Sequence, residues 1–126
     1  MPADIDKALN NEHSCIRSTA AFHRKHATEE NINKALDNND HTVRENAIRN
    51  PNASPNNINK ALNDKIAYIR LYAIRHLNAT PDNINKALDD DNIKVKLAAV
   101  NHPNASLANK EKAYNDPELI SYLLKQ

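Results

Sequence analysis

Basic side chains recur at one position of a repeated pattern, and their spacing is compatible with two different chemistries. The members of this basic ladder are Arg17, Arg44, Arg70 and Lys96. Cations lined up across stacked helical layers could contact the phosphates of a nucleic acid. They could instead tie neighbouring loops together, because a carboxylate or an amide precedes each of them by six residues. Those residues are Asn11, Asn38, Asp64 and Asp90. We favour the structural role and keep phosphate binding as the alternative.

A second set of cations recurs with a similar period. Its members are Lys7, Lys34, Lys60, Lys86 and Lys112. Charged residues on amphipathic helices usually occupy the solvated face, so we expect this column to be exposed. The net charge of the chain is only +1. No global field therefore draws the chain to nucleic acid or to a membrane, and such binding would need a local patch.

Aromatic and basic side chains cluster at helical spacing in one part of the chain. Tyr68, Leu71, Tyr72 and Arg75 lie together at helical spacing. The two tyrosines and Arg75 stand where neighbouring units have Thr42, Asn46 and Arg49, or Lys94, Ala98 and Asn101. Tyrosine and arginine are favoured anchors of protein interfaces. We predict a partner-binding patch centred on these four residues. Arg49 and Leu97 flank the predicted patch. The alternative is that a tyrosine packs between layers and the rest is ordinary surface.

Histidines share one repeat position but do not form a metal-binding pattern. His23, His76 and His102 are equivalent, and Asn50 takes the same position in another copy. Equivalent positions in successive layers are too far apart to ligate one ion at about 2 Å. The chain has no glycine for a phosphate-binding loop, no paired nucleophile and base, and no HExxH motif. We therefore expect no metal, no cofactor and no enzymatic activity.

These side chains are positioned by a repeat with a period of 26 residues. The letters Ile-Asn-Lys-Ala-Leu occur at 32–36, 58–62 and 84–88. Such a period indicates stacked supersecondary units. We treat residues 1–126 as a single domain of this kind. Its predicted units lie near 5–31, 32–57, 58–83 and 84–109, followed by a C-terminal cap over 110–126.

Each unit is predicted to contain two helical pieces. The first is short, either α or 3₁₀, and begins at an N-cap such as Ser54 or Thr80 with proline following. The second is longer and repeats an apolar pattern, as in Val43, Ala47 and Ile48. Because glycine is absent, we expect asparagine to supply the left-handed conformation at helix ends.

Composition limits the core and the compartment. The 126 residues are 40% hydrophobic but only 4% aromatic, so thin layers of Ala, Ile, Leu and Val are expected. The one cysteine, Cys15, cannot form a disulfide within the chain. The first residues lack the apolar segment of a signal peptide, and no run of about 18 apolar residues occurs. We expect a cytoplasmic protein that does not enter membranes.

The repeated unit, best seen from Val43 to Leu62, resembles the leucine-rich repeat variant family. Its helical repeats are similar in architecture to HEAT repeats. The resemblance covers roughly Ile5 to Asp116, although 26 residues is slightly long for the family. It implies a right-handed superhelix and a role as an interaction scaffold. An iron–sulfur cluster found in some members is not expected here, because the required thiols are missing.

These observations converge on an all-α, right-handed solenoid of short two-helix repeats. We expect a non-enzymatic scaffold that binds another protein and modulates a larger complex. Two alternatives stay open: a nucleic-acid-binding module that uses the basic ladders, and a self-assembling structural protein. The sequence leaves the oligomeric state undecided.

Overall fold

The computed structural model describes residues 27–125, and this part of the chain is entirely helical. It contains no strand and consists of eight α-helices. They are α3 (Glu29–Ala35), α4 (His41–Ile48), α5 (Pro55–Ala61), α6 (Ala67–Arg75), α7 (Pro81–Ala87), α8 (Ile93–Val100), α9 (Leu107–Tyr114) and α10 (Pro117–Leu124). The predicted all-α class is therefore confirmed for these residues. The short pieces, for which α and 3₁₀ were both open, are α-helices.

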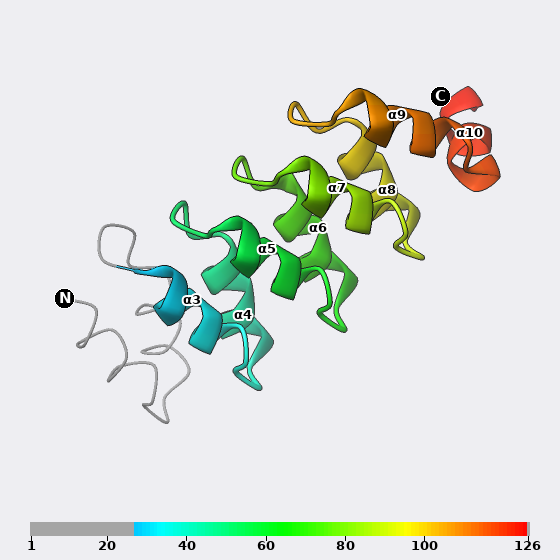
Figure 1. Ribbon diagram of the computed structural model, residues 1–126. Coiled ribbons are helices and arrows are strands. Elements are labelled where there is room, and N and C mark those ends of the chain that lie inside the picture. The colour runs from blue at the N-terminus through cyan, green and yellow to red at the C-terminus, as the bar shows by residue number, and fades with distance from the viewer. Residues whose placement is uncertain (1–26, 126) are drawn as a thin grey trace.

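The helices form an extended array of pairs (Figure 1). The odd-numbered helices pack on one another in sequence, from α3 to α9, and begin at residues 29, 55, 81 and 107. The even-numbered helices form the second layer, in which α6 packs between α4 and α8 and α10 packs on α8. The surface of the array is consequently built from equivalent positions of successive helices.

Capping boxes define where the odd-numbered helices begin. Thr28, Ser54, Thr80 and Ser106 each accept a hydrogen bond from the backbone N–H three residues later. In return, the Oδ1 atom of the asparagine at that later position accepts the backbone N–H of the cap residue. Reciprocal bonding satisfies donors that the first helical turn would otherwise leave unpaired. The N-caps predicted at Ser54 and Thr80 are confirmed.

The core is a series of thin aliphatic layers between the helices. Val43, Ala47 and Ile48 of α4 have no exposed surface, and the same holds for Ile69 and Ala73 of α6. All buried hydrophobic residues between 27 and 125 are Ala, Ile, Leu or Val. The expected aliphatic core is confirmed over this range. Alanine at the contacts lets the helices approach closely, which compensates for the scarcity of large side chains.

One prediction about the backbone is wrong. No residue in the range 27–125 has a positive φ angle, so asparagine does not act as a left-handed helix terminator there. The turns instead use side-chain acceptors. Asn50 Oδ1 accepts the backbone N–H of Asn52 at 2.8 Å, which closes the turn after α4 without a left-handed residue.

The predicted unit boundaries do not coincide with the ends of the observed helices. The unit boundaries placed at 58, 84 and 110 fall within α5, α7 and α9, because they were counted from the repeated isoleucine and not from the N-cap. Most of the unit predicted at 5–31 lies outside the described residues, as do Arg17 and Cys15. No helix within 27–125 combines the length and the apolarity needed to cross a bilayer.

Candidate functional site

The basic ladder is joined to backbone and carboxylate groups on two successive loops. Arg44 Nη1 donates to the carbonyl oxygens of Asn38 at 2.8 Å and Asn39 at 3.0 Å. Arg44 Nε donates to Asp64 Oδ2, 20 residues further along, at 2.8 Å. The two side chains of this ion pair are only 8% and 7% exposed. Arg44 is therefore held between the loop of its own unit and the loop of the next.

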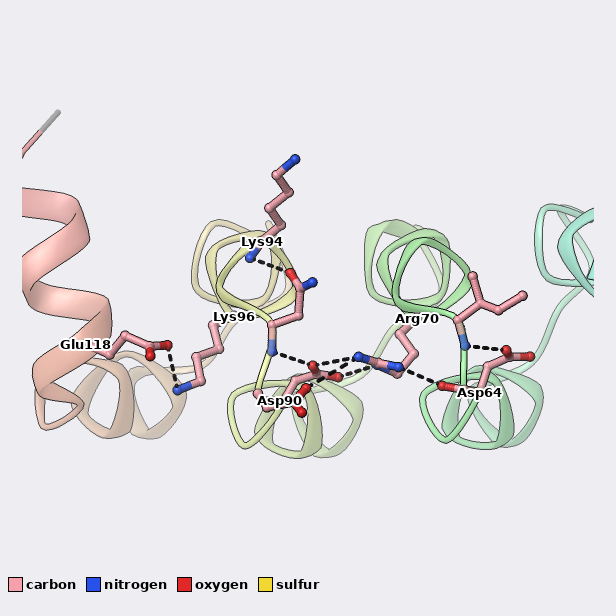
Figure 2. Close-up of polar contacts among 9 residues, drawn as sticks. Asp64, Arg70, Asp90, Lys94, Lys96 and Glu118 are labelled. Atoms are coloured by element: carbon pink, nitrogen blue, oxygen red, sulfur yellow. Dashed lines mark hydrogen bonds and ion pairs between the residues drawn. The ribbon is translucent and has the colours of Figure 1, made fainter.

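Arg70 repeats this geometry in the next unit of the array (Figure 2). Its Nη1 donates to the carbonyl oxygen of Asp64, and its Nε donates to Asp90 Oδ2, both at 2.8 Å. The sequence suggested that Arg70 pairs with the side chain six positions earlier, but Arg70 bonds only the backbone carbonyl of Asp64. Its carboxylate is already engaged by Arg44 and by the backbone N–H of Ile66. The acidic partner therefore comes from the following unit.

Lysine replaces arginine in the last described step of the ladder. Lys96 Nζ donates to Asp116 Oδ2 at 2.8 Å. It also lies 3.5 Å from Glu118 Oε1 (Figure 2). The hydrogen bond from Lys96 lowers the pKa of the Asp116 carboxyl, and the same bond raises the pKa of Lys96. The described ladder cations thus all have acidic partners. Arg17 lies outside the described residues.

The second lysine column also bridges neighbouring units, although it lies at the surface. Lys60 donates to the Asn33 carbonyl and to Asp37, and Lys112 donates to the Asn85 carbonyl and to Asp89. Lys86 donates to the Asn59 carbonyl. Each of these lysines reaches back to the preceding odd-numbered helix or the loop that follows it. Most of the positive charge on this face is consequently engaged within the molecule.

Histidines form a further inter-unit ladder whose role was not apparent from the sequence. His102 Nε2 donates to the carbonyl of His76 at 2.8 Å, and His76 Nε2 donates likewise to the carbonyl of Asn50. The Nδ1 atoms accept the backbone N–H groups of Asn78 and Asn104 at 3.0 Å. In both rings Nε2 is thus the donor and Nδ1 the acceptor. The sequence shows that these positions are equivalent. It does not indicate that each ring bonds the backbone carbonyl of the preceding unit.

The two tyrosines of the predicted patch lie against each other on α6. Tyr68 and Tyr72 meet edge to face with their centroids 6.2 Å apart, and the Arg49 guanidinium lies 5.3 Å from the Tyr72 ring centroid. Tyr68 is 41% exposed, whereas Tyr72 is half-buried. Loss of hydration, followed by the charge of Glu45, raises the pKa of the Tyr68 phenol. Neither ring is fully enclosed between helical layers.

His41 belongs to this aromatic group, although the sequence did not indicate it. Its Nδ1 lies 3.0 Å from the hydroxyl of Tyr68, and the two rings meet edge to face. His41 begins α4 and Tyr68 lies in the first turn of α6, so the contact joins adjacent units of the array. No pattern in the sequence pairs these residues, because they lie 27 positions apart in different helices.

The remaining patch residues lie beside this aromatic group. Leu71 is partly buried and packs against the core. Arg75 is exposed and lines an open hollow of about 400 Å³ together with Leu97 and Lys94. The structure thus divides the predicted patch into an aromatic group and a basic, apolar hollow. We define the candidate patch by the six predicted residues, which are Arg49, Tyr68, Leu71, Tyr72, Arg75 and Leu97.

The candidate patch has the chemistry of a recognition surface. Its groups offer aromatic faces, hydroxyl and guanidinium donors, and aliphatic area, which suit non-covalent binding. Over the range 27–125, no cluster of three or more His, Cys, Asp or Glu side chains is arranged to hold a metal ion. No protein-family model, curated protein or solved structure matches the chain.

Proposed function

We propose that this chain is a non-enzymatic helical-repeat scaffold that binds another protein through the candidate patch. The main support is the contrast between two groups of basic residues. The ladder side chains of Arg44, Arg70 and Lys96 are joined to acidic partners within the chain. Arg75 lies exposed on α6, the helix that also carries Tyr68 and Tyr72. Exposed tyrosine and arginine together can contribute apolar contact area and directional hydrogen bonds to a partner.

The finer architecture forms part of the same proposal. We infer a right-handed superhelix of 26-residue units that extends through the unit at 5–31, as the resemblance to leucine-rich repeat variant proteins implies. The regular starts of α3, α5, α7 and α9 support the period. A cytoplasmic scaffold that modulates a larger complex would suit this architecture, because solenoids expose long surfaces relative to their mass.

Affinity capture from a lysate of the native host tests the proposed function. The immobilised proteins are the wild type, a Tyr68→Ala/Arg75→Ala patch variant and an Asn33→Ala/Asn59→Ala control. The control residues are exposed on α3 and α5. Each capture is repeated after nuclease treatment. We expect the wild type and the control to retain one protein that the patch variant retains about 10-fold less well, as loss of interface anchors predicts.

Three outcomes would contradict the proposal. Equal retention by the patch variant would exclude this surface. Loss of capture after nuclease treatment would favour the nucleic-acid-binding alternative. Self-assembly would be favoured if the immobilised chain retained only further copies of itself and if light scattering gave a molecular mass that rises with concentration.

A further inference from the structure

Two open hollows lie side by side at the carboxyl end of α8. The first, of about 400 Å³, extends along Lys94, Leu97 and Ala98 to Arg75 of the neighbouring α6. The second, of about 420 Å³, is lined by Val100, Lys110, Tyr114 and Leu123. The hollows share Asn101, His102 and Pro103 as lining residues, so they adjoin at the turn after α8, and we call the two together the double hollow.

The double hollow is lined by three cations and by no acidic residue. The cations are Arg75, Lys94 and Lys110, and all three are exposed. None of their side chains makes an ion pair or a hydrogen bond with another residue in the range 27–125. Figure 2 shows Lys94 directed away from the neighbouring Lys96, which instead turns toward Glu118. Lys96 also donates to Asp116. The double hollow therefore retains positive charge that the chain itself does not neutralise.

Apolar side chains lie between these cations, chiefly in the first hollow. Leu97, Ala98, Val100 and Leu123 are partly buried and pack against the core, so their outward surfaces form a supported floor. Tyr114 is 63% exposed at the edge of the second hollow. A ligand that combines negative charge with apolar groups would satisfy both parts of this surface, because it would pair the cations and cover the floor.

We propose that the double hollow binds a short acidic peptide segment with apolar side chains, presented by the protein partner. One carboxylate of the segment pairs with Arg75 and Lys94, a second pairs with Lys110, and an apolar side chain covers Leu97 and Ala98. This inference rests on the proposed function, since the first hollow includes Arg75 and Leu97 of the candidate patch. It adds the chemical class of the partner segment and a second contact area at Lys110 and Tyr114.

The number and arrangement of the cations favour a peptide over a nucleic acid. Proteins that bind duplex DNA through its backbone typically neutralise about 6–10 phosphates. The double hollow offers only three cations, with apolar side chains among its lining residues, and the described ladder cations are already paired with acidic residues. A few carboxylates alternating with apolar groups match this pattern better than a continuous line of phosphates.

Fluorescence anisotropy tests the proposal with synthetic probes. The probes are fluorescein-labelled ten-residue peptides in which two or three glutamates alternate, at varied spacing, with leucine or phenylalanine. A matched set has glutamine in place of every glutamate. We expect saturable binding of at least one acidic peptide, weakened about 10-fold or more in its glutamine counterpart and by rising salt, because screening acts on exposed charges.

Charge reversal locates the binding on the protein. Lys94→Glu/Lys110→Glu should weaken the acidic peptide about 10-fold or more. The matched control, Lys65→Glu/Lys125→Glu, changes the net charge equally at residues that line neither hollow. It should keep the affinity within about twofold, as expected for residues outside the contact. Circular dichroism confirms that both variants remain helical.

The outcomes separate this inference from the proposed function. No saturable binding by any acidic peptide, or equal binding by the glutamine set, overturns the acidic-peptide proposal. So does equal weakening by both charge reversals. Tighter binding of a single-stranded oligonucleotide, lost in the Lys94→Glu/Lys110→Glu variant, would assign the double hollow to nucleic acid. If a captured protein still depends on Tyr68 and Arg75 while the acidic peptides fail, the proposed function stands and only this inference falls.

Discussion

Arg70 Nε donates to Asp90 Oδ2 at 2.8 Å, and the two side chains that form this bond belong to successive units of the array. The same guanidinium donates through Nη1 to the carbonyl of Asp64 in its own unit. A single side chain therefore fixes two loops relative to each other. Because the Arg70 and Asp90 side chains are only 15% and 8% exposed, solvent screens the pair weakly.

Arg70→Ala should be strongly destabilising. The substitution leaves the buried carboxylate of Asp90 without its counter-ion, and loss of one partner of a buried pair typically costs about 3 kcal/mol or more. Urea denaturation followed by circular dichroism measures the change in the free energy of unfolding. Arg75→Ala is the matched control, because Arg75 is exposed and makes no such pair among the described residues; we expect a change within about 0.5 kcal/mol. Equal stability of the two variants would contradict the structural role of the ladder.

Histidine 102 should tolerate asparagine better than phenylalanine. The His102 ring is buried, donates to the His76 carbonyl and accepts from the Asn104 N–H. Phenylalanine leaves both backbone groups unsatisfied, which should cost about 2–4 kcal/mol. Asparagine can still accept the N–H two residues later, as Asn50 does at the equivalent position. Equal free energies of unfolding for the two variants would show that these hydrogen bonds contribute little.

Asn83→Asp should be destabilising although the two side chains have nearly the same shape. Asn83 Nδ2 donates to the Pro55 carbonyl at 3.2 Å, and its Oδ1 accepts the Thr80 N–H at 3.0 Å. An aspartate keeps the acceptor but places a buried carboxylate oxygen against the Pro55 carbonyl. We expect a loss of about 2 kcal/mol in denaturation experiments. The exposed Asn59→Asp is the control and should change stability little; an equal loss there would argue against the inter-unit bond.

The Lys96–Asp116 pair predicts how one substitution changes stability with pH. The lowered pKa of Asp116 adds stability that is complete above the ordinary value of 3.8 and is lost as the pH falls through the folded value. The raised pKa of Lys96 adds stability that is complete below 10.5 and is lost as the pH rises through the folded value. Asp116→Asn should therefore be less stable than the wild type at neutral pH, by about 1–2 kcal/mol.

Denaturation at several pH values checks this expectation. The difference between Asp116→Asn and the wild type should shrink as the pH falls below 3.8 and disappear below the lowered pKa of Asp116, where the folded wild type is protonated as well. Asp89→Asn is a suitable control, because Asp89 is 69% exposed in its pair with Lys112 and should contribute little. A difference for Asp116→Asn that stays constant into acid would show that its charge is not the cause.

Local features of the fold could be predicted from the sequence because they depend on nearby residues. The caps at Ser54 and Thr80 follow from a hydroxyl before proline and an asparagine three residues later. The buried face of α4 follows from the spacing of Val43, Ala47 and Ile48. These features need only the geometry of one helix.

Contacts between units could not be predicted in the same way. The carboxylate partner of Arg70 is Asp90 and not Asp64, because the stacking of the loops decides which side chain is within reach. His41 joins the tyrosines for the same reason. The placement of Arg75, Lys94 and Lys110 on two adjoining hollows likewise requires the packing of α6, α8 and α9 to be known.

The most direct test of the account measures stability and partner binding in the same pair of variants. Arg70→Ala should lose about 3 kcal/mol of stability but, at a temperature where it is folded, bind the captured protein within about twofold of the wild type. Tyr68→Ala/Arg75→Ala should keep most of its stability and bind about 10-fold or more weakly in isothermal titration calorimetry. The reverse pattern, with binding lost in folded Arg70→Ala and kept in the patch variant, would contradict the division between structural ladder and binding patch.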